Sequence, residues 1–159
     1  PHGDCAGRAL GIAQADEISG SLTLAFSLLE LTETSLRGQL DSRVPICANE
    51  ANCKAVAEAS FAKFGITAEG GMQEPHHTPA DSPLVKTLLR CYEQFTGDPG
   101  KCLAIGGGTY VHDIPGGVAF GCCMPGFNGN MHGADEHTSI ADQLTAAKIF
   151  TQAIIDLCS

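Results

Sequence analysis

Residues 22–28 read Leu-Thr-Leu-Ala-Phe-Ser-Leu, and residues 36–46 read Leu-Arg-Gly-Gln-Leu-Asp-Ser-Arg-Val-Pro-Ile. Apolar side chains alternate with small or polar ones in both runs, which is typical of strands with one buried face. The polar residues 32–35, Thr-Glu-Thr-Ser, lie between the runs and predict a turn. The stretch therefore predicts an antiparallel hairpin. The polar face of its second strand carries Arg37, Gln39, Asp41 and Arg43.

A helix is expected directly after this hairpin. Asn49 is a suitable N-cap, apolar residues follow at helical spacing, and Gly65 supplies a left-handed stop. Residues 66–72 are expected to form a further strand. Residues 6–13 are expected to supply part of the first half of the same folding unit. Strand, strand, helix, strand is the latter part of a ferredoxin-like βαββαβ unit.

The turn-rich residues 74–79, Glu-Pro-His-His-Thr-Pro, predict a domain boundary. We interpret the adjacent histidines there as part of a junction turn, because neighbouring side chains of an extended chain point to opposite sides. A second helix is expected with Ser82 as its N-cap, Pro83 at its first position and Gly97 at its end.

The remainder alternates short apolar runs with helices. Residues 102–105 and 118–121 are expected to be buried strands, and a last helix is expected to begin after Ser139. Its predicted core face comprises Ile140, Leu144, Ala147, Phe150, Ile154 and Leu157. This order favours an α/β layer, so the whole chain is assigned to the α+β / α/β class.

Charge and composition narrow the classes of partner. The net charge of −9 is spread along the chain and argues against nucleic acid, whose phosphates need a basic surface. No apolar run approaches the ~18 residues of a membrane span, and no signal peptide opens the chain. The eight cysteines include no C-x-x-C pair. We therefore expect a cytoplasmic protein with reduced, mostly buried thiols.

The densest polar cluster is residues 130–137, Asn-Met-His-Gly-Ala-Asp-Glu-His. The imidazole of His132 is a good zinc ligand, at a distance of about 2.0–2.1 Å. Asp135 or Glu136 could steady that ring. A solvated polar loop before a helix explains the same pattern, and both interpretations remain open.

Two further features could bind a carboxylate. Residues 106–110, Gly-Gly-Gly-Thr-Tyr, allow close backbone approach, and their N–H groups can receive an anion. The alternative is a tight turn. Arg43 could clamp a carboxylate through two hydrogen bonds, or form an ordinary surface ion pair with Asp41.

Six stretches together resemble the signature of peptidase V-type dipeptidases, which belong to the co-catalytic zinc exopeptidases together with carnosinases and acetylornithine deacetylases. In chain order the stretches are Asp-Ser-Arg-Val-Pro (41–45), His-His-Thr-Pro-Ala-Asp-Ser-Pro-Leu-Val (76–85), Ala-Ile-Gly-Gly-Gly-Thr-Tyr-Val (104–111), Gly-Val-Ala-Phe-Gly (117–121), Met-Pro-Gly (124–126) and Met-His-Gly-Ala-Asp-Glu (131–136).

The resemblance implies a ferredoxin-like lid portion over residues 1–75 and the C-terminal portion of a zinc-peptidase catalytic domain over residues 76–159. It further implies that His132 is the terminal zinc ligand and that Arg43 grips the free carboxylate of a dipeptide substrate. Gly107, Gly108 and Thr109 would line the cleft nearby. Such enzymes hold two zinc ions per active site, with manganese or cobalt as alternatives.

The family's other ligands and its glutamate base lie in an N-terminal half that these residues do not contain. We therefore expect no catalytic residue in this chain, no tight zinc binding and no activity by it alone, and a tendency to self-associate. Two alternatives remain open: a non-catalytic peptide-binding module of the same fold, and a deacylase acting on N-acylated amino acids.

Overall fold

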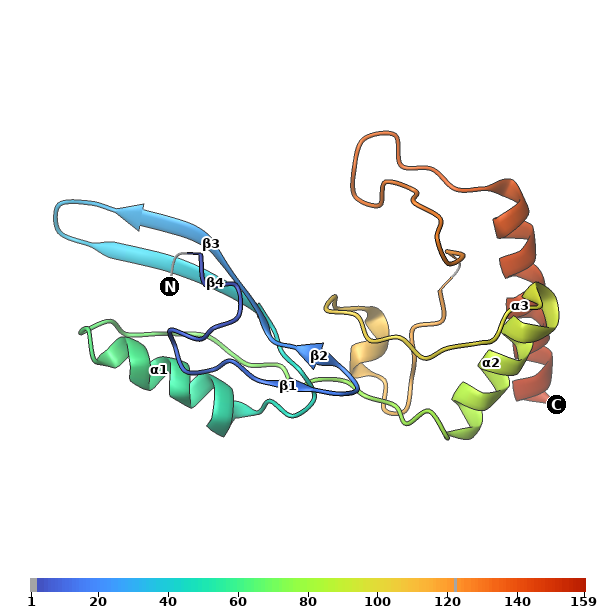
Figure 1. The fold of residues 1–159 in the computed structure, drawn as a ribbon, viewed down its shortest axis with the longest axis horizontal. Coiled ribbons are helices and arrows are strands. Elements are labelled where there is room, and N and C mark those ends of the chain that lie inside the picture. The colour runs from blue at the N-terminus through green and yellow to red at the C-terminus, as the bar shows by residue number, and fades with distance from the viewer. Residues whose placement is uncertain (1–2, 122) are drawn as a thin grey trace. The chain divides into compact units, whose positions relative to one another are not determined.

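The computed structural model describes residues 3–121 and 123–159, which form helices and two small antiparallel sheets (Figure 1). The chain divides into two compact units. Unit 1 comprises Pro1–His77 and Ala104–His112, and unit 2 comprises Thr78–Leu103 and Asp113–Ser159. The chain therefore leaves unit 1 after His77, returns to it for one short segment, and leaves it again after His112.

The predicted hairpin is confirmed in unit 1. Strand β3 (Thr23–Leu31) pairs antiparallel with β4 (Leu36–Arg43), in a register that sets Thr23 opposite Arg43 and Leu31 opposite Leu36. The pairing is irregular between Phe26 and Leu28. A smaller hairpin precedes it, formed by β1 (Ala15–Asp16) and β2 (Gly20–Ser21).

The core of unit 1 lies at the base of the long hairpin, against the helical segment formed by η1 (Glu50–Lys54) and α1 (Ala55–Ala62). The predicted cap is confirmed, because the Asn49 side chain accepts from the backbone N–H groups of Ala51 and Asn52. Gly65 has the expected left-handed φ of 71°. The buried core residues are Leu10, Ile12, Leu22, Leu24, Ala48 and Cys53.

The strand predicted in unit 1 after the helix is absent, and the segment before β1 has no regular secondary structure. Residues 66–72 form no strand, although Met72 packs against the core. Residues 6–13 are turns and coil, yet they supply Leu10 and Ile12 to the core. A strand needs a neighbour to satisfy its backbone hydrogen bonds, and β3 and β4 pair only with each other within the part of the chain that the structure describes.

Asp16 fastens the turn between β1 and β2 to the chain that follows β4. Its carboxylate accepts from the Ser19 N–H at 2.6 Å, from the Ser19 hydroxyl at 2.7 Å and from the Cys47 N–H at 3.4 Å. The Ser19 hydroxyl oxygen in turn accepts from the Ile46 N–H at 2.9 Å. The Ser19 donors are the main reason that the pKa of Asp16 falls from 3.8 to about 2.

This lowered pKa makes stability depend on acidity. The ionised carboxylate stabilises the fold above the unfolded pKa of 3.8, and the contribution is lost as the pH falls towards about 2. We expect Asp16→Asn to melt at a lower temperature than the wild type at pH 7, and the difference to shrink between pH 4 and pH 2. Melting curves across this range, followed by circular dichroism, measure it. A difference that stays constant with pH would contradict this role of Asp16.

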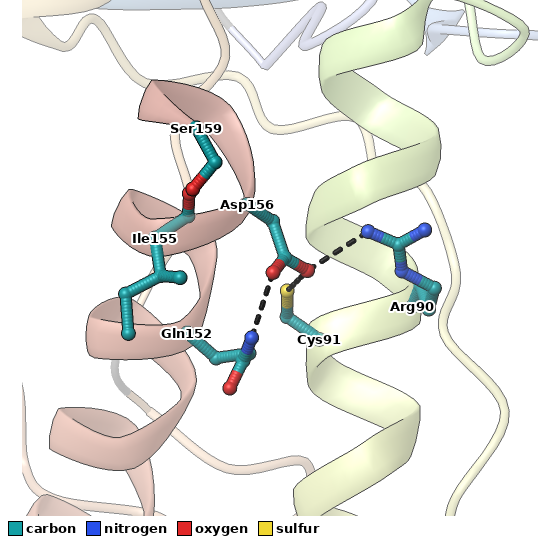
Figure 2. A network of polar contacts seen from close by, with 6 residues as sticks. All are labelled: Arg90, Cys91, Gln152, Ile155, Asp156 and Ser159. Carbon is teal, nitrogen blue, oxygen red and sulfur yellow. Dashed lines mark hydrogen bonds and ion pairs between the residues drawn. The ribbon is translucent and has the colours of Figure 1, made fainter.

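In unit 2, helices α2 (Pro83–Thr96) and α3 (Ile140–Cys158) lie side by side (Figures 1 and 2). The predicted ends of α2 are confirmed: the Ser82 side chain accepts from the Val85 N–H, Pro83 opens the helix, and Gly97 ends it with a φ of 76°. Leu88 and Cys91 of α2 pack against Ile149 and Ala153 of α3.

A polar network crosses this helix pair (Figure 2). The Asp156 carboxylate accepts from the Arg90 guanidinium at 2.8 Å, from the Gln152 amide at 2.7 Å and from the Cys91 thiol at 3.6 Å. The Gln152 and Arg90 donors lower the pKa of Asp156. Burial, with the adjacent Asp156 charge, raises the pKa of the Cys91 thiol, which favours a packing role for this cysteine.

The predicted core face of α3 is wrong, although its start at Ser139 is confirmed by the Ser139 hydroxyl, which accepts from the Asp142 N–H. Of the predicted residues only Phe150 is half-buried, with its ring edge to face on that of Phe120 at 5.5 Å. Ile140, Leu144, Ala147, Ile154 and Leu157 are exposed, while Ala146, Ile149 and Ala153 are buried. The helix carries apolar residues on more than one face, and its periodicity alone does not say which face meets α2.

The two apolar runs of the second half are not strands. Residues 102–105 and 118–121 pair with no strand among the described residues, and Leu103 and Ile105 are exposed. Val118 and Phe120 still pack against the α2–α3 core. None of the helices in the described ranges is long and apolar enough to cross a membrane.

The expectation of mostly buried cysteines is also wrong. All seven described cysteines are free thiols, and only Cys53 and Cys91 are buried. Cys122 lies outside the described residues. The exposed thiols lie in turns or coil, or at the end of α3, where no layer of the described chain covers them: Cys5, Cys47, Cys102, Cys123 and Cys158.

Candidate functional site

Arg43 is the last residue of β4, opposite Thr23. Its guanidinium lies 3.6 Å from the Asp41 carboxylate, and its side chain is 56% exposed. The surface ion pair between Arg43 and Asp41, one of the two roles that the sequence suggested for Arg43, is therefore present. Such an exposed pair is worth only about 0–1 kcal/mol. Most of the five N–H donors of the guanidinium remain available for another carboxylate.

The glycine loop belongs to the same unit as Arg43, although it lies far along the chain. The segment Ala104–His112 returns from unit 2 to unit 1. A Cβ added at Gly106 would lie 3.4 Å from Cγ and 3.5 Å from Cβ of Arg43, so the loop backbone lies against the aliphatic part of the arginine side chain. The structure thus brings Arg43 and the glycine loop together.

Gly107 and Gly108 lie in open surroundings. A Cβ added at either residue meets no atom within 4 Å, and neither residue has the left-handed φ that favours glycine. Within residues 3–121 and 123–159, their backbone N–H groups donate to no other residue. Free backbone N–H groups next to a cation can receive an anionic group such as a carboxylate.

His132 lies in unit 2, on a loop closed at its base. The His137 N–H donates to the Gly129 carbonyl at 2.9 Å, and the rings of Phe127 and His137 meet edge to face at 5.5 Å. Gly129 packs so closely against the His137 backbone that a side chain there would collide. The loop is therefore held at its ends.

The backbone of this loop is unusual between those ends. Asn130, His132 and Asp135 have left-handed φ values of 54°, 63° and 55°. Asn, Asp and His adopt this region more readily than other non-glycine residues, but at a cost in conformational energy. The sequence pattern gave no sign of this conformation. It turns the chain sharply on both sides of His132, and the His132 side chain is exposed.

The residues around His132 provide one ligand of a metal site at most. Its imidazole is a donor that zinc accepts. No hydrogen bond joins the ring to Asp135 or Glu136, and the Asp135 carbonyl instead contacts Nδ1 of His137 at 2.9 Å. No group of three or more His, Cys, Asp and Glu side chains that could hold a metal ion occurs in the described part of the chain. A catalytic zinc usually has three protein ligands.

His112, which follows the glycine loop and to which the sequence motifs assigned no role, contacts His76 of the junction turn. Nε2 of His112 is 2.9 Å from the Glu74 carbonyl oxygen, and the His112 ring is 5.8 Å from that of His76. His112 belongs to the short turn η2 (Tyr110–Asp113) that follows the loop. Its contact partners are far away in the sequence, so no local pattern pointed to them.

Comparison with known proteins gives one consistent result. The model of a family described as "Peptidase family M20/M25/M40" matches residues 6–156. The chain is 39% identical over 157 residues to the "Putative dipeptidase YtjP" of Bacillus subtilis (strain 168). It is 33% identical over 158 residues to the "Beta-Ala-Xaa dipeptidase" of Lactobacillus delbrueckii subsp. lactis. Each match covers 98% of the chain but 33% of the relative, so the chain spans about a third of the length of these curated relatives.

Proposed function

The chain belongs to peptidase family M20/M25/M40, and on that premise we propose that it is the C-terminal portion of a dipeptidase that hydrolyses unblocked dipeptides. The longer protein that would contain it is called the intact protein below. Two relatives whose names specify dipeptidases support the substrate class, since each aligns along nearly the whole chain. Within the family, the six motif stretches favour the peptidase V-type branch.

We assign the two parts of the sequence to two different domains of the intact protein. Residues 1–75 would form part of a ferredoxin-like lid, an assignment supported by the antiparallel β3–β4 pair with α1 packed beside its base. Residues 76–159 would belong to the catalytic domain. The free thiols of the described cysteines suit a reducing compartment, and we propose the cytoplasm as the location.

The contact between Arg43 and Gly106 carries the proposal. It places the aliphatic part of the Arg43 side chain against the residue that precedes Gly107 and Gly108. The N–H groups of those two glycines have no partner among the described residues. In the proposed complex Arg43 donates to the free carboxylate of the dipeptide, and the loop N–H groups and the Thr109 hydroxyl contact its backbone. A charge-assisted pair of this kind gives both affinity and orientation. These residues bind and orient the substrate.

Peptidases of this family are generally metal-dependent. We propose His132 as one metal ligand, with zinc as the metal and two ions in each active site of the intact protein. A bound metal of this kind would supply an activated water for hydrolysis. Because the described residues include no group of three ligands, the remaining ligands and the general base would come from the rest of the intact protein. The isolated chain is therefore expected to be inactive.

One experiment tests this function. The intact protein, stripped with a chelator and then supplied with zinc, manganese or cobalt, is expected to release amino acids from leucyl-alanine and β-alanyl-alanine. The 159-residue chain alone is expected to release none. Release of free amino acids, followed by chromatography, is the measurement.

Two controls separate the alternatives. N-acetyl-leucine in place of the dipeptide tests the deacylase, and preferential hydrolysis of it would replace the proposed substrate class. A His132→Ala variant of the intact protein is expected to hold less metal per chain, as measured by elemental analysis. An intact protein that binds dipeptides with full metal occupancy but does not cleave them would favour the non-catalytic peptide-binding module.

A further inference from the structure

We propose that His112 is a positioning residue of the candidate site, because its ring fastens the segment Ala104–His112 to unit 1 and so keeps the Gly106 backbone against Arg43. The proposal rests on the proposed function for its kinetic consequence, but its structural part stands on contacts within unit 1. His112 is the last residue of that segment, and the next residue belongs to unit 2.

Two contacts of the His112 ring attach the segment to unit 1. Its Nε2 atom lies 2.9 Å from the Glu74 carbonyl oxygen. A carbonyl oxygen only accepts, so Nε2 carries the hydrogen and donates it. The ring also contacts the His76 ring, at 5.8 Å between centroids. Both partners lie where the chain first leaves unit 1, since Thr78 already belongs to unit 2.

Most of the segment is exposed. Residues 104–110 are exposed, whereas Val111 and His112 are half-buried. The described residues show the Gly106–Arg43 contact near the start of the segment and the His112 contacts at its end. A segment with few buried contacts opens at a low free-energy cost. Loss of the His112 hydrogen bond should therefore release the loop from Arg43.

A second tie offers a matched control. The chain passes from unit 1 to unit 2 after His77 and again after His112. Within unit 2, close to these two points in the sequence, the Thr78 hydroxyl donates to the Gly117 carbonyl at 2.7 Å. Thr78→Val removes this donor and keeps the shape of the side chain. The substitution removes a hydrogen bond within unit 2 and leaves every contact of the Ala104–His112 segment with unit 1 in place.

The experiment compares three variants of the intact protein. His112→Phe keeps a ring beside His76 but cannot donate, and His112→Gln keeps a donor near the Glu74 carbonyl. For leucyl-alanine we expect His112→Phe to raise KM about threefold to tenfold with little change in kcat, because one neutral hydrogen bond is worth about 0.5–1.5 kcal/mol. His112→Gln and Thr78→Val should stay near the wild-type KM.

Backbone 15N order parameters of residues 106–109, measured by NMR relaxation, supply the readout that does not depend on activity. Lower order parameters in His112→Phe, with wild-type values in His112→Gln and Thr78→Val, support the proposal. Unchanged order parameters in His112→Phe overturn it. Lower order parameters with an unchanged KM in an active protein overturn the link to the site. If the intact wild type cleaves no dipeptide, the proposed function fails, and the order parameters still decide whether His112 holds the loop.

Discussion

Arg43→Ala in the intact protein is expected to raise the KM for leucyl-alanine about 10- to 150-fold, because hydrogen bonds to a charged group are worth about 1.5–3 kcal/mol and 1.4 kcal/mol is a factor of ten. The guanidinium would grip the free carboxylate, away from the bond that breaks. Its contribution is therefore the same in the ground state and in the transition state, and kcat should change little. Steady-state kinetics over a wide range of dipeptide concentration measures both constants.

Arg37 provides the matched control on the same face of β4. It is also an exposed arginine with an ion pair, to Glu30 at 3.8 Å, and its side chain is 80% exposed. Arg37→Ala should leave KM within about twofold of the wild type, since such surface pairs contribute about 0–1 kcal/mol. Arg43→Lys should give an intermediate KM, because an ammonium cannot form the bidentate pair. Equal effects at Arg37 and Arg43 would rule out specific carboxylate binding by Arg43.

Leu22→Ala is expected to destabilise unit 1 by about 2–5 kcal/mol, the usual cost of removing a large apolar side chain from a closed core. Leu22 is 2% exposed and precedes the long hairpin, in a cluster with Leu10, Ile12, Leu24 and Cys53. The two-unit chain need not unfold in a single step. Hydrogen exchange at the amides of Leu24 and Cys53, which donate to the carbonyls of Cys5 and Asn49, reports on unit 1 itself.

The control for this variant lies at the other end of β3. Leu31 is 74% exposed, next to the turn of the hairpin. Leu31→Ala should change the stability by less than about 0.5 kcal/mol, as is usual for exposed positions. A cost at Leu31 as large as that at Leu22 would mean that the apolar face of the hairpin is covered along its whole length.

Sequence patterns correctly predicted the elements that are stabilised by residues close together in the chain. Asn49, Ser82 and Ser139 each accept from a backbone N–H group within three residues, so the sequence alone identified three helix starts correctly. The alternating apolar pattern of the hairpin likewise identified both strands and their turn. Caps and tight turns are satisfied by neighbours in the chain, and their meaning changes little with the surrounding fold.

Predictions that required a distant partner succeeded less often. The strands predicted for residues 66–72, 102–105 and 118–121 are absent, because strand formation depends on a neighbouring backbone that an apolar run does not specify. Which face of α3 is buried depended on α2. Ala146, Ile149 and Ala153 are buried there, and none of these residues belongs to the predicted face.

The candidate site divides in the same way. The sequence alone identified Arg43, the loop residues Gly107, Gly108 and Thr109, and His132 as candidates, through residue chemistry and motif order. Only the tertiary structure decided that Gly106 lies against Arg43 and that His112 reaches the Glu74 carbonyl. These contacts join residues far apart in the chain. Their free energy depends on the fold that closes the intervening loop, and no local sequence pattern encodes it.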